Sequence, residues 1–135
     1  MINQQISTKS IARIADIQTL YQFASSKGDF DINSVLLRMK DFYKDSDFKS
    51  DHDIDEKSKL RLRPSYSYLD ELVKHTHDNL LAIDAIISTL LTKEWTINSI
   101  PVLLHAVLRV AICELNYFPE TPRKVIINEY TDIAN

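Results

Sequence analysis

The chain contains a single glycine, Gly28, among its 135 residues. Average usage would give about nine glycines in a chain of this length. Tight β-hairpin turns depend on glycine because it adopts positive φ without steric cost. A sequence with one glycine is therefore a poor candidate for an all-β sandwich or barrel, and it has no glycine-rich loop that could hold a phosphate.

Apolar residues recur at three- and four-residue steps, which is the spacing of one face of a helix. The first predicted helix starts at a Ser7 or Thr8 cap, and Gly28 lies where a left-handed residue would end it. A second helix is predicted from about residue 33 to residue 43. The fold class that follows is all-α, and no segment predicts a strand.

The second half of the chain carries the stronger helical pattern. It predicts one long helix from Tyr68 to about Leu91, or two helices with a bend between them. Pro101 is placed for a first helical turn and precedes a mostly apolar helix that we expect to be central and buried. Thr121 and Pro122 open the last predicted helix by the same rule.

Residues 44–64 lose this periodicity and are rich in charge. Such a segment has little apolar surface to offset the entropy cost of ordering it, so we predict a polar, mobile connection. The expected organisation is one domain over 1–135, with N-terminal helices in 1–43, the connection in 44–64 and C-terminal helices in 65–135.

Composition excludes several classes of protein. The chain is 44% apolar and 26% charged, as in ordinary globular proteins, and its net charge of −3 argues against indiscriminate coating of nucleic acid. There is no stretch of 18 apolar residues for a membrane span and no apolar signal core at the N-terminus. A lone cysteine, Cys113, also fits a reducing compartment, so we expect a cytoplasmic protein.

No residue pattern indicates catalysis, a metal site or a cofactor. His75 and His77 are two apart and would point in opposite directions from a helix, whereas metal ligands on one helix lie three or four apart. Cys113 lies in an apolar helix, where a thiol behaves as a small hydrophobic group. Nucleophile and phosphate-loop motifs are missing, so we predict a protein that is not an enzyme.

The first predicted helix carries a pattern typical of RNA recognition. Lys9 and Arg13 lie one turn apart, and Gln18 and Tyr21 follow. Cations can hold phosphates, an amide can read a base edge, and an aromatic ring can stack on a base. The alternative is that Tyr21 is a core residue and the two bases are solubilising charges, and the pattern alone favours that alternative.

Four polar residues interrupt the apolar pattern of the last two helices: Arg109, Glu114, Asn128 and Glu129. An unpaired buried charge is very costly, so we expect these side chains to pair with one another. We interpret them as a structural network that joins the helices rather than as a ligand site.

Four segments in order resemble the NusB family of bacterial transcription antitermination factors. They are ARIADIQTLYQF (residues 12–23), LLAIDAII (80–87), LRVAICEL (108–115), which follows Trp95, and TPRKVIINEYTDIA (121–134). The resemblance implies an all-α domain of two packed helical halves. It implies binding of boxA RNA together with the ribosomal protein NusE, and action on the RNA polymerase elongation complex in ribosomal RNA operons. Lys9, Arg13, Gln18 and Tyr21 fall on the family's RNA-binding positions.

The sequence also departs from the family. It has fewer N-terminal arginines, which predicts weaker unaided RNA affinity, and it ends at Asn135 where relatives continue into another helix. Without that helix, the inner apolar face of the last helices would be partly uncovered, and an exposed apolar patch favours a homodimer. Two alternatives stay open: the NusB-like domain of a ribosomal RNA cytosine methyltransferase, and a helical scaffold that does not bind RNA.

Overall fold

A computed structural model describes residues 7–53 and 63–135, and it describes side chains in these ranges except for 46–53. Every regular element within the described residues is a helix, which confirms the all-α prediction. No helix there is both long and apolar enough to cross a membrane. The helices are α1 (Thr8–Ser25), α2 (Ile32–Asp53), α4 (Tyr66–Asp78), α5 (Leu80–Leu90), α6 (Val102–Tyr117) and α7 (Arg123–Ala134).

The ends of α1 agree with the sequence signals. The Ser7 side chain caps the helix by accepting a hydrogen bond from the backbone N–H of Ser10 at 3.0 Å. Gly28 has a φ of +89°, as predicted for a left-handed residue after the helix. The helix itself ends three residues earlier, at Ser25, and Lys27 is also left-handed with a φ of 53°.

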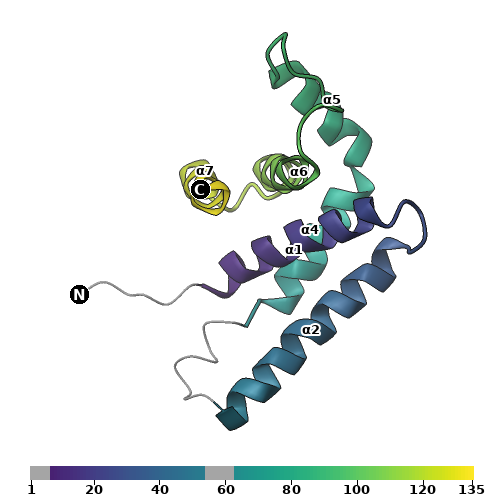
Figure 1. Cartoon of the computed structure of the whole chain (residues 1–135). Helices are drawn as coiled ribbons and strands as arrows, with labels where there is room; N and C mark the ends of the chain where they lie inside the picture. The colour runs from purple at the N-terminus through teal and green to yellow at the C-terminus, as the bar shows by residue number, and fades with distance from the viewer. Residues whose placement is uncertain (1–6, 54–62) are drawn as a thin grey trace.

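Helix α1 lies in the middle of the bundle (Figure 1). It packs against α2 on one side, against α6 on the other, and against α4, which crosses it. Helices α5 and α7 both pack against α6. Eight of the α1 residues are buried, and Arg13 and Asp16 are among them. A helix covered in this way has little outer surface in its first three turns, and this fact determines where the predicted site residues lie.

Helix α2 is longer than the sequence predicted. It continues from Ile32 through Asp53, so residues 44–53, assigned above to the mobile connection, are helical. The apolar pattern stops near Tyr43, but a helix does not need an apolar face along its whole length. The remainder of the predicted connection that falls in 54–62 lies outside the described residues.

The long helical pattern after Tyr68 resolves into two helices rather than one. Asn79 separates α4 from α5 with a φ of −119°, and its side chain donates a hydrogen bond to the backbone carbonyl of His75. The two prolines that were expected to open helices, Pro101 and Pro122, each occupy the position just before the helix. Helix α6 contributes to the core as expected, but its first turn is exposed, which was not predicted.

Candidate nucleic-acid interface

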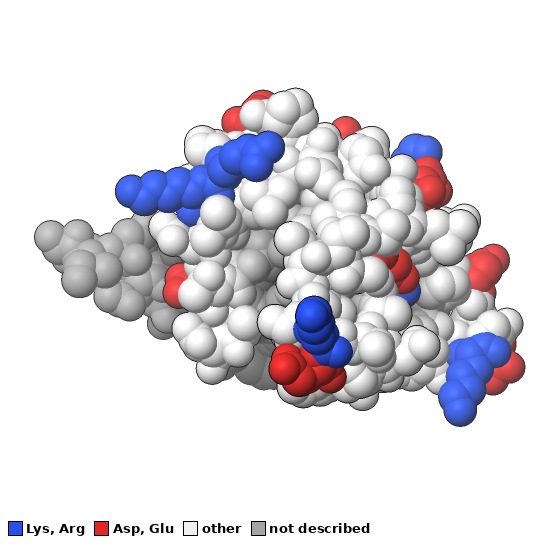
Figure 2. Space-filling model, turned by 90° about the horizontal axis from the view of Figure 1, so that it is seen from above, with Lys and Arg blue, Asp and Glu red and all other residues white. Residues whose placement is uncertain are grey.

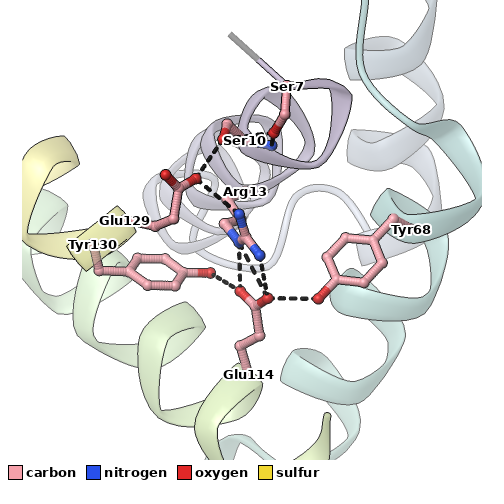
Figure 3. A network of polar contacts seen from close by, with 7 residues as sticks. All are labelled: Ser7, Ser10, Arg13, Tyr68, Glu114, Glu129 and Tyr130. Atoms are coloured by element: carbon pink, nitrogen blue, oxygen red, sulfur yellow. Dashed lines mark hydrogen bonds and ion pairs between the residues drawn. The ribbon is translucent and has the colours of Figure 1, made fainter. Parts of the chain in front are cut away.

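Arg13 lies inside the protein and not on its surface. Its side chain comes from α1 and points toward α6 and α7 (Figure 3). Its Nε donates to Oε1 of Glu114 at 2.8 Å and its Nη2 to Oε2 at 2.7 Å, while Nη1 donates to Glu129 at 2.8 Å. Only 3% of Arg13 is exposed. The prediction that Arg13 holds an RNA phosphate therefore needs correction, because its guanidinium is already paired with two carboxylates.

Glu114 is the acceptor at the centre of this network. In addition to Arg13, the hydroxyl groups of Tyr68 on α4 and Tyr130 on α7 donate to its carboxylate at 2.5 and 2.7 Å. Burial alone would raise the pKa of Glu114, but these hydrogen bonds and the Arg13 charge outweigh burial and hold the pKa below its usual value. The carboxylate is thus ionised at neutral pH, and four helices share one buried ion pair.

Glu129 extends the network toward the surface. Its side chain is partly exposed, and it accepts a hydrogen bond from the Ser10 hydroxyl as well as from Arg13. The Ser7 hydroxyl, which caps α1, is hydrogen-bonded to the same Ser10 hydroxyl at 2.8 Å. The start of α1 is therefore tied to α7 through polar contacts (Figure 3).

The four residues predicted to pair with one another do not do so, although Glu114 and Glu129 share one partner. Glu114 and Glu129 do meet, but through Arg13 and not through Arg109. Arg109 instead donates two hydrogen bonds, at 2.9 and 2.7 Å, to the carboxylate of Asp84 on α5. The same carboxylate is hydrogen-bonded to His105 at 2.8 Å. Asn128 is exposed on α7. The structure thus contains two carboxylate centres where the sequence suggested one.

A signal for the position of Arg13 was present in the sequence. Arg13 is four residues before Ile17 and seven before Leu20, and both of those are core residues. This is the spacing of one helix face, so Arg13 belongs to the apolar stripe of α1. Its partner in the network, Glu114, also sits in an apolar run, and two opposite charges in two buried stripes predict a pair.

Lys9 is the predicted cation that remains at the surface. It is exposed at the start of α1, and its Nζ lies 4.9 Å from the centre of the Tyr68 ring. A cation held over an aromatic face in this way is positioned but still open to solvent. Lys9 and Tyr21 are about 120° apart around the helix axis at 3.6 residues per turn. The four predicted residues consequently do not form one continuous patch.

Gln18 and Tyr21 do lie together, in a groove that we name the α1–α2 groove. The groove has a volume of about 430 Å³ and lies mainly between α1 and α2. Tyr21 is 42% exposed, so the alternative interpretation of this residue as a core tyrosine is wrong. The lining residues are Gln18, Tyr21, Gln22, Arg38, Met39, Phe42 and Leu103.

A hydrogen bond from α2 fixes the orientation of the Gln18 amide. Its Oε1 accepts a hydrogen bond from the hydroxyl of Tyr43 at 2.9 Å. Within residues 7–53 and 63–135 its Nε2 has no hydrogen-bond partner. The groove therefore presents an amide donor beside the Tyr21 ring.

Arg38 supplies a cation to the other wall of the groove. Its guanidinium carbon lies 4.4 Å from the centre of the Phe30 ring, which restricts the side chain while leaving it exposed. Phe42, from the next turn of α2, is 58% exposed. The sequence analysis missed Arg38 because α2 was judged only by its apolar stripe. The spacing of Phe42 places it on that stripe and predicts burial, which is wrong, because the structure leaves Phe42 exposed.

One face of the molecule carries mixed charge. On the face seen in Figure 2, acidic and basic side chains are scattered around a wide uncharged area, and no broad basic field covers that face. Such a surface cannot hold a polyanion by charge alone. RNA binding to this face would therefore rely on a few specific contacts.

The two histidines considered as ligands have structural roles. His75 stacks on Tyr117 with ring centres 6.0 Å apart, and His77 meets the edge of Phe23 at 5.3 Å. Among the described residues, no group of three or more His, Cys, Asp or Glu side chains could hold a metal ion.

Comparison with known proteins identifies the relatives of this chain. A sequence model described as the NusB family matches residues 10–135. The chain belongs to the NusB family. Transcription antitermination protein NusB of Rickettsia bellii strain OSU 85-389 is 42% identical over 135 residues, which is 100% of this chain and 82% of the relative. The NusB protein of Rickettsia massiliae strain Mtu5 is also 42% identical, over 100% of this chain and 83% of its own.

Family membership agrees with the architecture described above. The segments that carried the resemblance lie on α1, α5, α6 and α7, and all four contribute to the two carboxylate centres. In this NusB-family chain, Arg13 of the first segment meets Glu114 of the third and Glu129 of the fourth. The charged residues in those segments therefore have a structural reason that is independent of any ligand.

Proposed function

We propose that this chain is a transcription antitermination adaptor that binds single-stranded RNA and has no catalytic activity. Two relatives that are 42% identical to this chain are NusB proteins named for transcription antitermination. The single structural observation that supports RNA binding is the α1–α2 groove, where an exposed ring, an oriented amide donor and a cation lie around one hollow.

The groove suits a nucleobase. The Tyr21 ring offers a stacking surface, which is sequence-tolerant because every base has a π face. The Gln18 Nε2 can donate to a carbonyl or ring nitrogen at the edge of a base. Because Tyr43 fixes the Gln18 oxygen, the amide presents a donor to the groove and not an acceptor. Arg38 can pair with a neighbouring phosphate.

Lys9 supplies a second phosphate contact in this proposal. Since Lys9 and Tyr21 lie at different angles around α1, an RNA strand that meets both must cross the helix obliquely. Arg13 has no contact with RNA here and instead holds α1 in place. Two or three cations give modest affinity with a shallow dependence on salt.

We propose that the protein partner supplies the remaining affinity. The family resemblance points to boxA RNA and to the ribosomal protein NusE, acting on RNA polymerase in ribosomal RNA operons in the cytoplasm. Two proteins that each contribute part of an RNA interface bind it more tightly than either does alone. The antitermination relatives support this adaptor role over the methyltransferase alternative, since neither of them carries a methyltransferase name.

A gel-shift titration tests the proposal. The chain is mixed with NusE and titrated against boxA RNA and against a scrambled RNA of the same length and composition. We expect clear preference for boxA, and a weaker complex when NusE is left out. Equal binding of the two RNAs in the presence of NusE would contradict the adaptor function and leave the scaffold alternative.

A further inference from the structure

Asp16 is a carboxyl group in the centre of the helical bundle. Its exposed fraction is 0%, and its Oδ1 has no hydrogen-bond partner among the described residues. Its Oδ2 lies 3.0 Å from the hydroxyl oxygen of Thr76 on α4. The RNA-binding proposal makes no use of this group, so its chemical state needs its own explanation.

The hydrogen bonds of Thr76 leave no proton for Asp16. The Thr76 Oγ1 lies 2.6 Å from the backbone carbonyl of Leu72, one turn earlier on α4, and 3.0 Å from Asp16. A hydroxyl has one hydrogen, and a carbonyl oxygen can only accept. The shorter contact takes the hydrogen, so the longer contact needs a proton from the carboxyl side.

We propose that Asp16 is held as a neutral carboxylic acid in the folded protein, donating its proton to Thr76, and that its ionisation is a pH-sensitive switch of the junction between α1, α4 and α6. In this state the Thr76 hydroxyl donates to the Leu72 carbonyl and accepts from Asp16, so each of its two contacts has one hydrogen. The unpartnered Oδ1 is then the carbonyl oxygen of a neutral acid, and burying it costs much less free energy than burying a charged carboxylate oxygen.

The surroundings of Asp16 support the neutral state. The titratable groups that act on it from other helices are Cys113 and Glu114 on α6 and Tyr130 on α7, and each of these is negative when ionised. No described cation is among the groups that act on it: the nearby Arg13 is engaged with Glu114 and Glu129. Burial is the largest influence and raises the pKa of the Asp16 carboxyl to about 8, and the Glu114 charge acts in the same direction.

The sign of the pH effect follows from linkage. An aspartate in the unfolded chain loses its proton near pH 4. The folded protein keeps that proton until about pH 8. Between these values the unfolded state binds fewer protons, so the folded state loses stability as the pH rises, by up to about tenfold in the unfolding equilibrium constant per pH unit. Raising the pH through this window favours opening of the junction that positions α1.

Two measurements on the intact chain test the proposal. In the first, the side-chain carboxyl carbons of aspartate are labelled with ¹³C and followed by NMR from pH 4 to pH 9. The Asp16 resonance is assigned in the wild-type chain by through-bond correlation to its own backbone amide. We expect it to keep its protonated shift at pH 6 and to titrate far above the other aspartates. Titration below pH 5 would overturn the proposal, and this result does not depend on whether any variant folds.

In the second, urea unfolding is compared between pH 5 and pH 7.5 for the wild type, Asp16→Asn and Asp84→Asn. Asparagine can donate to Thr76 at any pH, so Asp16→Asn should lose the fall in stability with rising pH. Asp84 is ionised throughout this range, so Asp84→Asn should keep the wild-type fall. An Asp16→Asn protein with the wild-type pH dependence would overturn the proposal, whatever its RNA affinity.

Discussion

Arg13 and Glu114 are 101 residues apart in the sequence and form a buried, two-pronged ion pair, with the Arg13 Nε and Nη2 at 2.8 and 2.7 Å from the two carboxylate oxygens. Burial alone would lower the pKa of Arg13, but the hydrogen bonds and charge of Glu114 outweigh burial and raise it above its ordinary value. The pair joins α1 to α6, and Tyr68 and Tyr130 complete it from α4 and α7.

Replacing Glu114 with glutamine should strongly destabilise the protein. The variant leaves the buried Arg13 charge with only Glu129 to balance it, and breaking one partner of a buried pair costs about 3–5 kcal/mol. Urea unfolding at pH 7 measures this loss. The matched control is Glu129→Gln, which removes a partly exposed carboxylate from the same guanidinium and should cost clearly less. Equal losses in the two variants would mean that Glu114 is not the central acceptor.

Asp84 should contribute stability that disappears in acid. Burial alone would raise its pKa, but hydrogen bonds from Arg109 and His105 outweigh burial, and the pKa lies below the usual value. A group with a lowered pKa in the folded state stabilises the protein above pH 4, and this contribution is lost as the pH falls through the folded value. We expect Asp84→Asn to be less stable by about 1–2 kcal/mol at pH 7.

The same difference should shrink as the pH falls through the folded pKa of Asp84, because the wild-type carboxylate then becomes protonated and loses its charge. Thermal unfolding of both proteins between pH 2 and pH 7 provides the comparison. A difference that stays constant over this range would show that the Asp84 charge is not what stabilises the α5–α6 contact.

The Cys113 thiol should be unreactive toward thiol reagents in the folded protein. Burial raises the pKa of its thiol to about 12, and the thiolate is the reactive form. At pH 8 a thiol reagent should label the folded chain only as fast as the chain opens, and should label it quickly in concentrated urea. Since this is the only cysteine, the modified fraction reports a single site. Labelling of the folded chain at the rate of a free thiol would contradict its placement in the core.

The sequence predicted the type of nearly every element but only part of the site. The helices and the Ser7 cap follow from short-range rules, namely apolar spacing and capping chemistry. The role of Arg13 does not, because it depends on Glu114 and Glu129 arriving from more than a hundred residues away. The helical spacing of Arg13 with Ile17 and Leu20 indicates a side chain that faces the core, but the carboxylates that it contacts depend on how the helices pack.

The α1–α2 groove also depends on contacts between helices that the sequence pattern does not predict. Gln18 and Tyr21 were selected from the pattern of one helix, but their neighbours Arg38 and Phe42 come from another. The hydrogen bond from Tyr43 that orients the Gln18 amide spans 25 residues. Periodicity indicates which face of α2 is buried, and it says nothing of which outward side chains meet those of α1.

The affinity of Tyr21 variants for boxA RNA in the presence of NusE tests the account most directly. Fluorescence anisotropy compares the wild type, Tyr21→Ala and Tyr21→Phe, with circular dichroism confirming that each is folded. Stacking of a base on an aromatic ring is worth about 1–3 kcal/mol, so Tyr21→Ala should bind roughly 5- to 150-fold more weakly. Tyr21→Phe keeps the ring and should bind nearly as well as the wild type. Wild-type affinity in a folded Tyr21→Ala protein would contradict a nucleobase in the α1–α2 groove.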